Sequence, residues 1–380
     1  MSISRRDLLK HSGLAGLAAS LPLTACGTLP TSKGQGLKDL YAGDFTIGAA
    51  LNVDIIKQQE PYLTTLIKRE FNSITPENCM KWEEIRTANG GWNFEDADAF
   101  VAYGEANKME MVGHTLIWHS QMDNTVFFDK NGKYLSTDAL NRKVDEHIQT
   151  LVERYKGKLA HWDVVNEFIG DDNKYRQSHW FKTLGDTVFD RAFNLAHEID
   201  PKAHLVYNDY NIEREDKRNA TVEMLKKHLK RGTPIHGVGI QGHINIDTPS
   251  IADIEKSILA FADLGLRVHF TELDIDVLPL VWDLPTAEIS TRFEYRPERD
   301  PFKGGLTQEM SDRLARRYED LFKLFIKHAD KIDRITLWGV SDDATWLNGF
   351  PIPGRTSHPL LFDRNKQPKD AYFRVANLKK

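Results

Sequence analysis

Short apolar stretches alternate with longer amphipathic ones from residue 40 onward, and this alternation limits the folds open to the chain. The short stretches, rich in β-branched and aromatic residues, predict eight strands at residues 45–51, 71–75, 110–117, 160–166, 204–208, 237–241, 267–271 and 334–340. Apolar residues three and four apart predict intervening helices, among them 137–155, 180–199, 217–231, 251–263 and 307–328. Strands that alternate with helices form parallel sheets covered by helices.

Eight strands in this arrangement predict an α/β fold, a (β/α)8 TIM barrel, over residues 40–380 as a single domain. Its functional site would lie at the carboxyl ends of the strands. An open, doubly wound sheet is the alternative. Such a sheet normally carries a glycine-rich phosphate loop after its first strand, and the sequence GAALN at residues 48–52 lacks that pattern.

The first 26 residues have the features of an export signal and are excluded from the fold. The segment SRRDLLK at residues 4–10 resembles a twin-arginine signal, and the apolar run at 13–23 is too short to span a membrane comfortably. The run ends in LTACG at residues 23–27, which resembles a lipobox whose cysteine, Cys26, is lipidated after cleavage. A plain cleaved signal with an incidental cysteine is the alternative.

These signals predict an exported protein that a lipid anchor at Cys26 holds at the cell envelope. Gly27, and not an aspartate, follows the cysteine, which favours an outer-membrane lipoprotein facing either the periplasm or the cell surface. Residues 27–39, rich in Thr, Ser, Gly and Lys, predict a flexible tether between the anchor and the barrel.

The charge pattern argues against a polyanionic partner. The net charge is −5, and lysines and arginines are interspersed with acids, so no basic stripe indicates nucleic acid. Eight Trp and eleven Tyr exceed the needs of a core, and their flat apolar faces suit the C–H faces of sugars. The sequence has no CxxC pair or Cys/His cluster, so we expect neither a metal nor a cofactor. We also expect a monomer.

Polar and aromatic residues follow the predicted strands where each one ends. The segments are TPENCMKW (75–82), GHTLIWHSQ (113–121), NE (166–167), NDYN (208–211), QGH (241–243), E (272) and WGVSD (338–342). Because the parallel strands of a barrel end at one rim, these side chains would form a ring of donors, acceptors and flat faces. Such a ring suits an uncharged chain with many hydroxyl groups.

Two of the predicted strands each deliver a glutamate to this rim: HWDVVNEF (161–168) contains Glu167, and RVHFTELDID (267–276) contains Glu272. Glycoside hydrolysis needs two carboxyl groups, because one protonates the leaving oxygen while the other attacks or activates water. A single glutamate at a strand end is more often solvated or ion-paired. The two glutamates together, inside this ring, favour a catalytic site.

The catalytic interpretation sets conditions on both glutamates. Neighbours on a regular strand face opposite sides, so we expect a bulge or an early strand end at Asn166 and Glu167. An acid at Glu167 needs its proton, which burial against Trp118 and the charge of Glu272 favour. A nucleophile at Glu272 needs to be ionised, which donors such as His243 favour. Retention of configuration requires carboxyl groups about 5–5.5 Å apart.

With these motifs the chain resembles glycoside hydrolase family 10, the retaining endo-β-1,4-xylanases, over nearly all of residues 40–373. The shared motifs are TPEN and MKW, GHTLIWHSQ, WDVVNE, NDYN, GIQGH, TELDI and WGVSD. The resemblance implies a (β/α)8 barrel with Glu167 as acid/base and Glu272 as nucleophile. It also implies that xylan or xylo-oligosaccharides are the substrate.

The resemblance implies sugar-contacting roles for a larger set of residues. Asn166 is the natural partner of the 2-hydroxyl of the sugar at the cut, and His243 resembles a histidine that hydrogen-bonds the nucleophile. The implied substrate-binding residues are Glu77, Asn78, Lys81, His114, Trp118, Gln121, Asn166, Tyr210, Gln241, His243, Trp338 and Trp346.

Other chemically active residues have more ordinary explanations. The spacing of His114 and His119 fits no usual pattern of metal ligands. Cys79 lies in a predicted sugar-contacting motif, and a buried free thiol is its simplest interpretation. Three nearby aspartates are expected to have structural roles or to support the residues that contact the sugar, and not to be catalytic: Asp163, Asp274 and Asp276.

Two departures from the family pattern bear on specificity. The loop from Leu278 to Gly305 is longer than typical strand-to-helix loops. It either rims the leaving-group side, where its arginines would favour decorated or acidic xylan, or is an ordinary surface loop. Trp346 is followed by Leu347 and not by arginine, so we expect contacts beyond the cut to differ.

The leading prediction is an endo-1,4-β-xylanase. The same retaining mechanism on another β-glycan, or exo action on xylo-oligosaccharides, is the nearest alternative, because pocket shape decides between them. A non-catalytic glycan-binding envelope lipoprotein is the alternative from another class. Loss of Glu167, Glu272 or Asn166 would indicate it, and all three are present.

Overall fold

The computed structural model describes residues 34–87, 90–281 and 290–380. The predicted signal, the lipidation site Cys26 and most of the predicted tether lie outside these residues. The folded unit begins at Gln35, earlier than residue 40, since it includes the short helix α1 (Leu37–Leu40). Leu37 is fully buried, and its N–H donates to Glu70 Oε2 at 2.9 Å. Among the described helices, none is long and apolar enough to cross a membrane.

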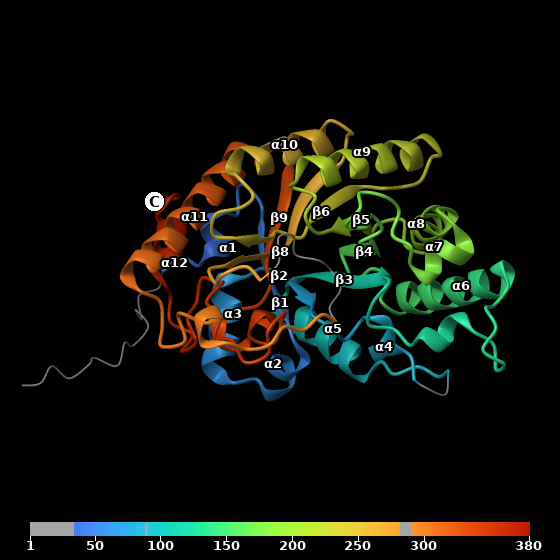
Figure 1. Cartoon of the computed structure of the whole chain (residues 1–380), viewed down its shortest axis with the longest axis horizontal. Helices are drawn as coiled ribbons and strands as arrows, with labels where there is room; N and C mark the ends of the chain where they lie inside the picture. Colours follow the sequence, from blue (N-terminus) through green and yellow to red (C-terminus); the bar gives the residue numbers. More distant parts are fainter. Residues whose placement is uncertain (1–33, 88–89, 282–289) are drawn as a thin grey trace, which may run out of the picture. The chain divides into compact units, whose positions relative to one another are not determined.

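Eight parallel strands close into a barrel (Figure 1). In chain order they are β1 (Thr46–Leu51), β2 (Ser73–Pro76), β3 (Glu110–Ile117), β4 (His161–Asn166), β5 (His204–Asp209), β6 (Gly237–Ile240), β8 (Arg267–Asp276) and β9 (Ile332–Leu337). The pairings of β6 with β8 and of β9 with β1 complete the ring. The predicted single TIM barrel is confirmed.

The strands differ from the prediction mainly at the carboxyl end of β8. This strand continues to Asp276 instead of ending at Thr271. Its extension offers a free backbone edge, and the short strand β7 (His243–Asn245) pairs with it in parallel. The sequence analysis did not predict β7, since three residues carry no periodic signal.

Helices surround the strands (Figure 1). The remaining α-helices are α2 (Val53–Gln58), α3 (Pro61–Glu70), α4 (Trp82–Ile85), α5 (Glu95–Asn107), α6 (Thr137–Arg154), α7 (His179–Leu184), α8 (Thr187–Ile199), α9 (Glu215–Lys230), α10 (Ile251–Ala262), α11 (Gln308–Lys327) and α12 (Asp370–Asn377). The 3-10 turns are η1 (Asn124–Phe127), η2 (Pro297–Arg299), η3 (Asp342–Ala344) and η4 (Trp346–Asn348). The prediction of one helix over 180–199 is wrong, because α7 ends at Leu184 and the next residue, Gly185, has a φ of +63° that interrupts the helix.

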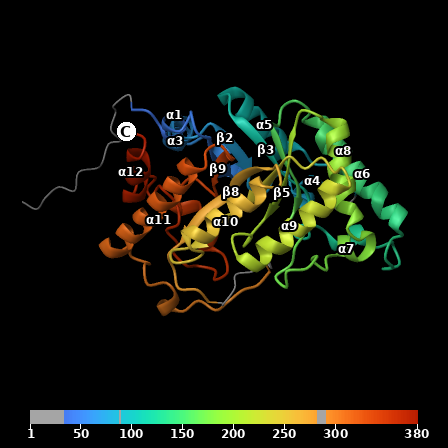
Figure 2. The same ribbon diagram turned by 90° about the horizontal axis from the view of Figure 1, so that it is seen from above.

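The hydrophobic core lies between the strands and the helices. On α6 the apolar residues Val144, Ile148 and Leu151 share one face and are fully buried. Phe270 of β8 packs on Phe325 of α11 with ring centroids 4.3 Å apart. Helix α12 lies beside α11 in both views (Figures 1 and 2). This core holds the helices on the outside of the barrel.

Several buried polar side chains lie inside the barrel, and glycines make room for them. A Cβ on Gly237 would lie 2.8 Å from the Nε2 atoms of both His204 and His269. A Cβ on Gly239 would lie 2.3 Å from Asn208 Oδ1. Residues two apart on a strand share a face, so these inward positions continue toward the carboxyl ends of the strands. Asn208, near the carboxyl end of β5, therefore lies at the rim of the barrel, where the functional site is.

Candidate active site

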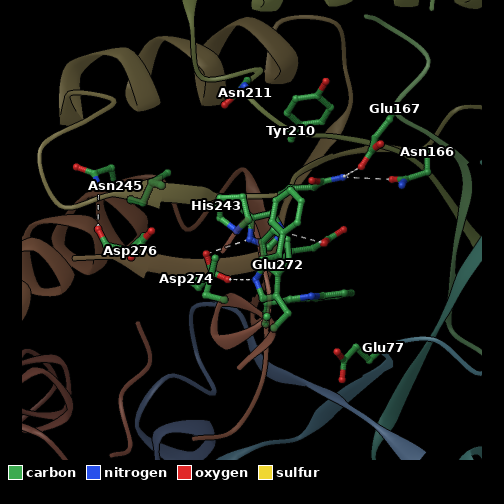
Figure 3. A pocket seen from close by; sticks show the side chains of 18 of the residues that line it. Glu77, Asn166, Glu167, Tyr210, Asn211, His243, Asn245, Glu272, Asp274 and Asp276 are labelled. Carbon is green, nitrogen blue, oxygen red and sulfur yellow. Dashed lines mark hydrogen bonds and ion pairs between the residues drawn. The ribbon is translucent and has the colours of Figure 1, made fainter. Parts of the chain in front are cut away.

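A cleft of about 410 Å³ lies at the carboxyl ends of the strands (Figure 3). It is lined by every residue that the sequence analysis predicted for catalysis or sugar binding: Glu77, Asn78, Lys81, His114, Trp118, Gln121, Asn166, Glu167, Tyr210, Gln241, His243, Glu272, Trp338 and Trp346. These residues come from segments far apart in the sequence, and closure of the barrel brings them to one place.

Glu167 directly follows β4, which ends at Asn166. The pairing of β4 with β5 shifts in register between Asp163 and Val165. Glu167 itself has a φ of +58°, in the left-handed region that non-glycine residues rarely adopt. This turn ends the alternation of the strand, so both Asn166 and Glu167 line the cleft. The predicted irregularity at these two residues is confirmed.

Two neutral donors hold the carboxyl group of Glu167. Trp118 Nε1 donates to Oε2 at 2.7 Å, and Gln241 Nε2 donates to Oε1 at 2.9 Å. His119 Nδ1 lies farther away, 3.7 Å from Oε2. Only 5% of Glu167 is exposed, so the group is fixed in a largely dry site. An indole and an amide orient a carboxyl group without placing a full positive charge beside it.

Glu272 lies within β8 and has a different environment. His243 Nε2 lies 3.1 Å from its Oε2, and Asn208 Nδ2 donates to its Oε1 at 2.7 Å. Burial raises the pKa of Glu272, but the hydrogen bond from His243 and the charges of His114 and His243 outweigh burial. The net effect holds the pKa of Glu272 below its usual range, so this carboxylate is ionised at neutral pH.

A second carboxylate supports His243 (Figure 3). His243 Nδ1 lies 3.0 Å from Asp274 Oδ1, and Trp346 Nε1 donates to Asp274 Oδ2 at 2.8 Å. Burial lowers the pKa of His243, yet Asp274 and Glu272 together raise it to about 10. The imidazolium therefore keeps its charge beside Glu272 through the acid and neutral range. Asp274 has the structural role that the sequence analysis assigned to it.

Side chains near the start of α4 form a hydrogen-bonded group in the cleft wall. Lys81 Nζ donates to Asn78 Oδ1 at 3.0 Å and to Gln121 Oε1 at 2.7 Å. Gln121 Nε2 donates to the same Asn78 oxygen at 3.0 Å. Burial raises the pKa of Glu77, and the charge of Lys81 opposes this rise. The group presents fixed donors and acceptors of the kind that sugar hydroxyls require.

Neither His114 nor a group of three histidines inside the barrel has surroundings that favour a metal ion. His114 Nδ1 lies 2.9 Å from Asp163 Oδ2 and is engaged in that pair. In the part of the chain that the structure describes, three other histidines have ligand atoms within 4.8 Å of one another: His161, His204 and His269. Burial, together with the charge of the buried Arg334, lowers the pKa of all three. A fixed cation beside them disfavours a divalent metal ion.

Sequence reasoning missed part of the cleft. Asn208 donates to Glu272 and was visible only as the first residue of the NDYN motif. Burial raises the pKa of Asp276 to about 6, while Arg355 at 3.6 Å opposes this rise. Asn211, Leu280 and Arg292 also line the cleft, and the sequence analysis covered them only as parts of the NDYN segment and of the loop from Leu278 to Gly305. It did not name Asn245 or Phe350 as lining residues. Leu280 and Arg292 belong to the long loop after β8, so its described ends rim the cleft.

Cys79, the other thiol of the sequence, is buried as predicted. Burial raises the pKa of its thiol to about 12, so it stays protonated. A protonated, buried thiol is a poor nucleophile.

The fold and the site define a class of protein: a parallel barrel whose rim carries two buried carboxyl groups with unequal surroundings, as in glycoside hydrolases. The model of glycosyl hydrolase family 10 matches residues 36–378. The chain belongs to this family.

Several relatives and solved structures are similar over most of the chain. Endo-1,4-beta-xylanase A of Xylanibacter ruminicola is 41% identical over 342 residues, which cover 90% of this chain and 93% of that protein. An endo-1,4-beta-xylanase of Geobacillus stearothermophilus is 38% identical over 93% of this chain and 100% of that protein. The structure of a GH10 endoxylanase retrieved from a sugarcane soil metagenome is 55% identical, covers 90% of this chain and 100% of its own, and has a TM-score of 0.88.

Replacing the imidazolium beside Glu272 tests the electrostatics of the site. The pKa of Glu272 is lowered, so an activity that requires this carboxylate is expected to be lost as the pH falls through that pKa. In His243→Gln the burial of Glu272 remains but the positive charge is gone, so its pKa rises. We expect the acid limb of kcat/KM against pH to move to higher pH. His197→Gln, on α8, is the control and should leave the acid limb unchanged. An acid limb that also stays unchanged in His243→Gln contradicts the conclusion that His243 lowers the pKa of Glu272.

Proposed function

We propose that this protein is an endo-1,4-β-xylanase that hydrolyses internal β-1,4-xylosidic bonds of xylan and xylo-oligosaccharides with retention of configuration. The observation that carries the proposal is the contrast between two equally buried glutamates: neutral donors hold Glu167, and an imidazolium keeps Glu272 ionised. Membership of glycosyl hydrolase family 10 and the similarity to endo-1,4-beta-xylanases support xylan as the substrate.

The mechanism has two displacements. In the first, Glu272 attacks the anomeric carbon while the bond to the leaving oxygen breaks and that oxygen takes the proton of Glu167. In the second, Glu167 removes a proton from water, the water oxygen bonds to the anomeric carbon, and the bond to Glu272 breaks. Each displacement inverts the anomeric centre, so the product retains the configuration of the substrate.

The rest of the cleft binds the sugar chain on both sides of the glutamates. Figure 3 shows Glu77 and Asn245 on different sides of Glu272, which suits a substrate that extends in both directions. Asn166, next to Glu167, is the proposed partner of the 2-hydroxyl at the cut, a contact that strengthens as positive charge develops on the ring. Trp338 lies edge-on to His114 with ring centroids 5.5 Å apart and offers a flat wall.

We also propose that the protein is lipidated at Cys26 and held at the outer membrane. The proposal is supported by the twin-arginine-like segment, the apolar run and the lipobox-like sequence at residues 23–27. A Cys26→Ser variant would move from the membrane fraction to the soluble fraction of cells that make the full chain, with xylan cleavage unchanged. An unchanged distribution contradicts a lipid anchor at this residue.

That the protein acts as a monomer stays a prediction.

Product analysis on long xylan tests the proposed activity. Internal cleavage gives a mixture of short oligosaccharides from the start of the reaction, and NMR of the first product should detect the β-anomer before mutarotation. Glu272→Ala removes the nucleophile and should lower the rate at least about 10⁴-fold. Release of single sugars from chain ends alone contradicts the endo mode, and α-anomers contradict retention.

A further inference from the structure

The backbone at Glu167 is held in a conformation that its own side chain disfavours. Its φ of +58° lies in the left-handed region, directly after the last residue of β4. Residues other than glycine keep such a conformation only where their surroundings impose it. The direction of the Glu167 side chain therefore depends on the groups that hold this turn.

Side chains and backbone from other elements bind the polar backbone groups of the turn. The N–H of Glu167 donates to the carbonyl of Asn208 at 2.8 Å. The carbonyl oxygen of Glu167 accepts from Arg176 Nε at 2.9 Å. The N–H groups of residues 168 and 169 donate to the hydroxyl of Tyr207 at 3.2 and 3.3 Å. Of these groups, only Arg176 carries a charge.

Arg176 links the turn to the wall of the cleft. Its Nη2 donates to the hydroxyl of Tyr210 at 2.8 Å and to the carbonyl of Ile169 at 3.3 Å. The Tyr210 hydroxyl in turn donates to Asp171. Tyr210 is 5% exposed and lines the cleft, so one guanidinium fixes both a wall residue and the backbone of Glu167.

A second cation supports the same tyrosine from another direction. Lys217 Nζ lies 3.4 Å from the centroid of the Tyr210 ring. The same nitrogen donates to Asp209 Oδ1 at 2.8 Å, and Tyr207 also donates to Asp209. Tyr207, Tyr210 and Arg176 thus belong to one network around the turn, in which the two tyrosines are buried and Arg176 is half-buried. The side chain of Glu272 is bound by His243 and Asn208 and not by Arg176. Movement of the guanidinium would therefore disturb Glu167 more than Glu272.

We propose that Arg176 is a positioning residue for the acid/base: it holds Glu167 where its proton reaches the leaving oxygen. The proposal rests on the proposed role of Glu167. In the first displacement, the proton passes from Glu167 to the oxygen as the bond between that oxygen and the anomeric carbon breaks, and Arg176 keeps its own protons throughout. Loss of Arg176 therefore impairs proton delivery and spares the attack by Glu272.

Aryl β-xylobiosides with leaving groups of different acidity separate these two effects. Phenolate needs a proton as it leaves, whereas 2,4-dinitrophenolate does not. In Arg176→Met we expect kcat/KM for the phenyl substrate to fall about 100-fold, since a small misplacement of a catalytic group has about that effect. For the dinitrophenyl substrate we expect a loss of less than about threefold. Lys174→Met removes a positive charge from the same loop and is the matched control; it should match the unaltered protein on both substrates.

Several outcomes overturn the proposal. Equal losses on both substrates mean that Arg176 supports the fold in general, and no loss means that it has no part in positioning. Thermal unfolding shows whether Arg176→Met folds. If it does not, Arg176→Lys replaces it, because lysine keeps the charge but has a single donor group. The proposal is then overturned if the rates of Arg176→Lys depend on the leaving group in the same way as those of the unaltered protein. Failure of the proposed function is distinguishable, because then the unaltered protein cleaves neither substrate.

Discussion

Closure of the parallel sheet is the constraint on which the site depends. The pairing of β6 with β8 completes the ring of strands. All of these strands run in the same direction, so their carboxyl ends meet at one rim. Glu167 after β4 and Glu272 on β8 lie far apart in the sequence and meet only because the ring is closed. Inside the ring, glycines on β6 leave room for the polar side chains that extend to this rim.

The chemistry proposed for the site depends on neighbours and not on burial. Glu167 and Glu272 are each 5% exposed, so burial alone does not distinguish them. What separates them is the groups that bind their carboxyl oxygens: His243, held by Asp274, stays protonated, binds Glu272 and keeps that carboxylate ionised. Glu167 has an indole and an amide in the corresponding places. Two identical side chains can thus take the roles of acid and nucleophile.

The sequence was sufficient to predict the barrel and the members of the site, because both follow from local patterns. Strand and helix periods predicted the eight strands, and the residues just after each strand predicted the lining of the cleft. Contacts between distant segments could not be predicted in this way. No local pattern indicates that Asn208 donates to Glu272, that β7 pairs with the extended β8, or that Arg176 binds the carbonyl of Glu167. These contacts depend on three-dimensional neighbours and on the left-handed backbone of one residue.

Trapping of the covalent intermediate tests the central claim most directly. In 2,4-dinitrophenyl 2-deoxy-2-fluoro-β-xylobioside, the fluorine slows both displacements and the dinitrophenyl group speeds the first, so a glycosyl-enzyme accumulates. Peptide mass spectrometry of the treated protein should find one fluorinated xylobiosyl group, attached to Glu272. A label on any other residue, or a folded protein that releases dinitrophenolate without forming a labelled peptide, would contradict the account.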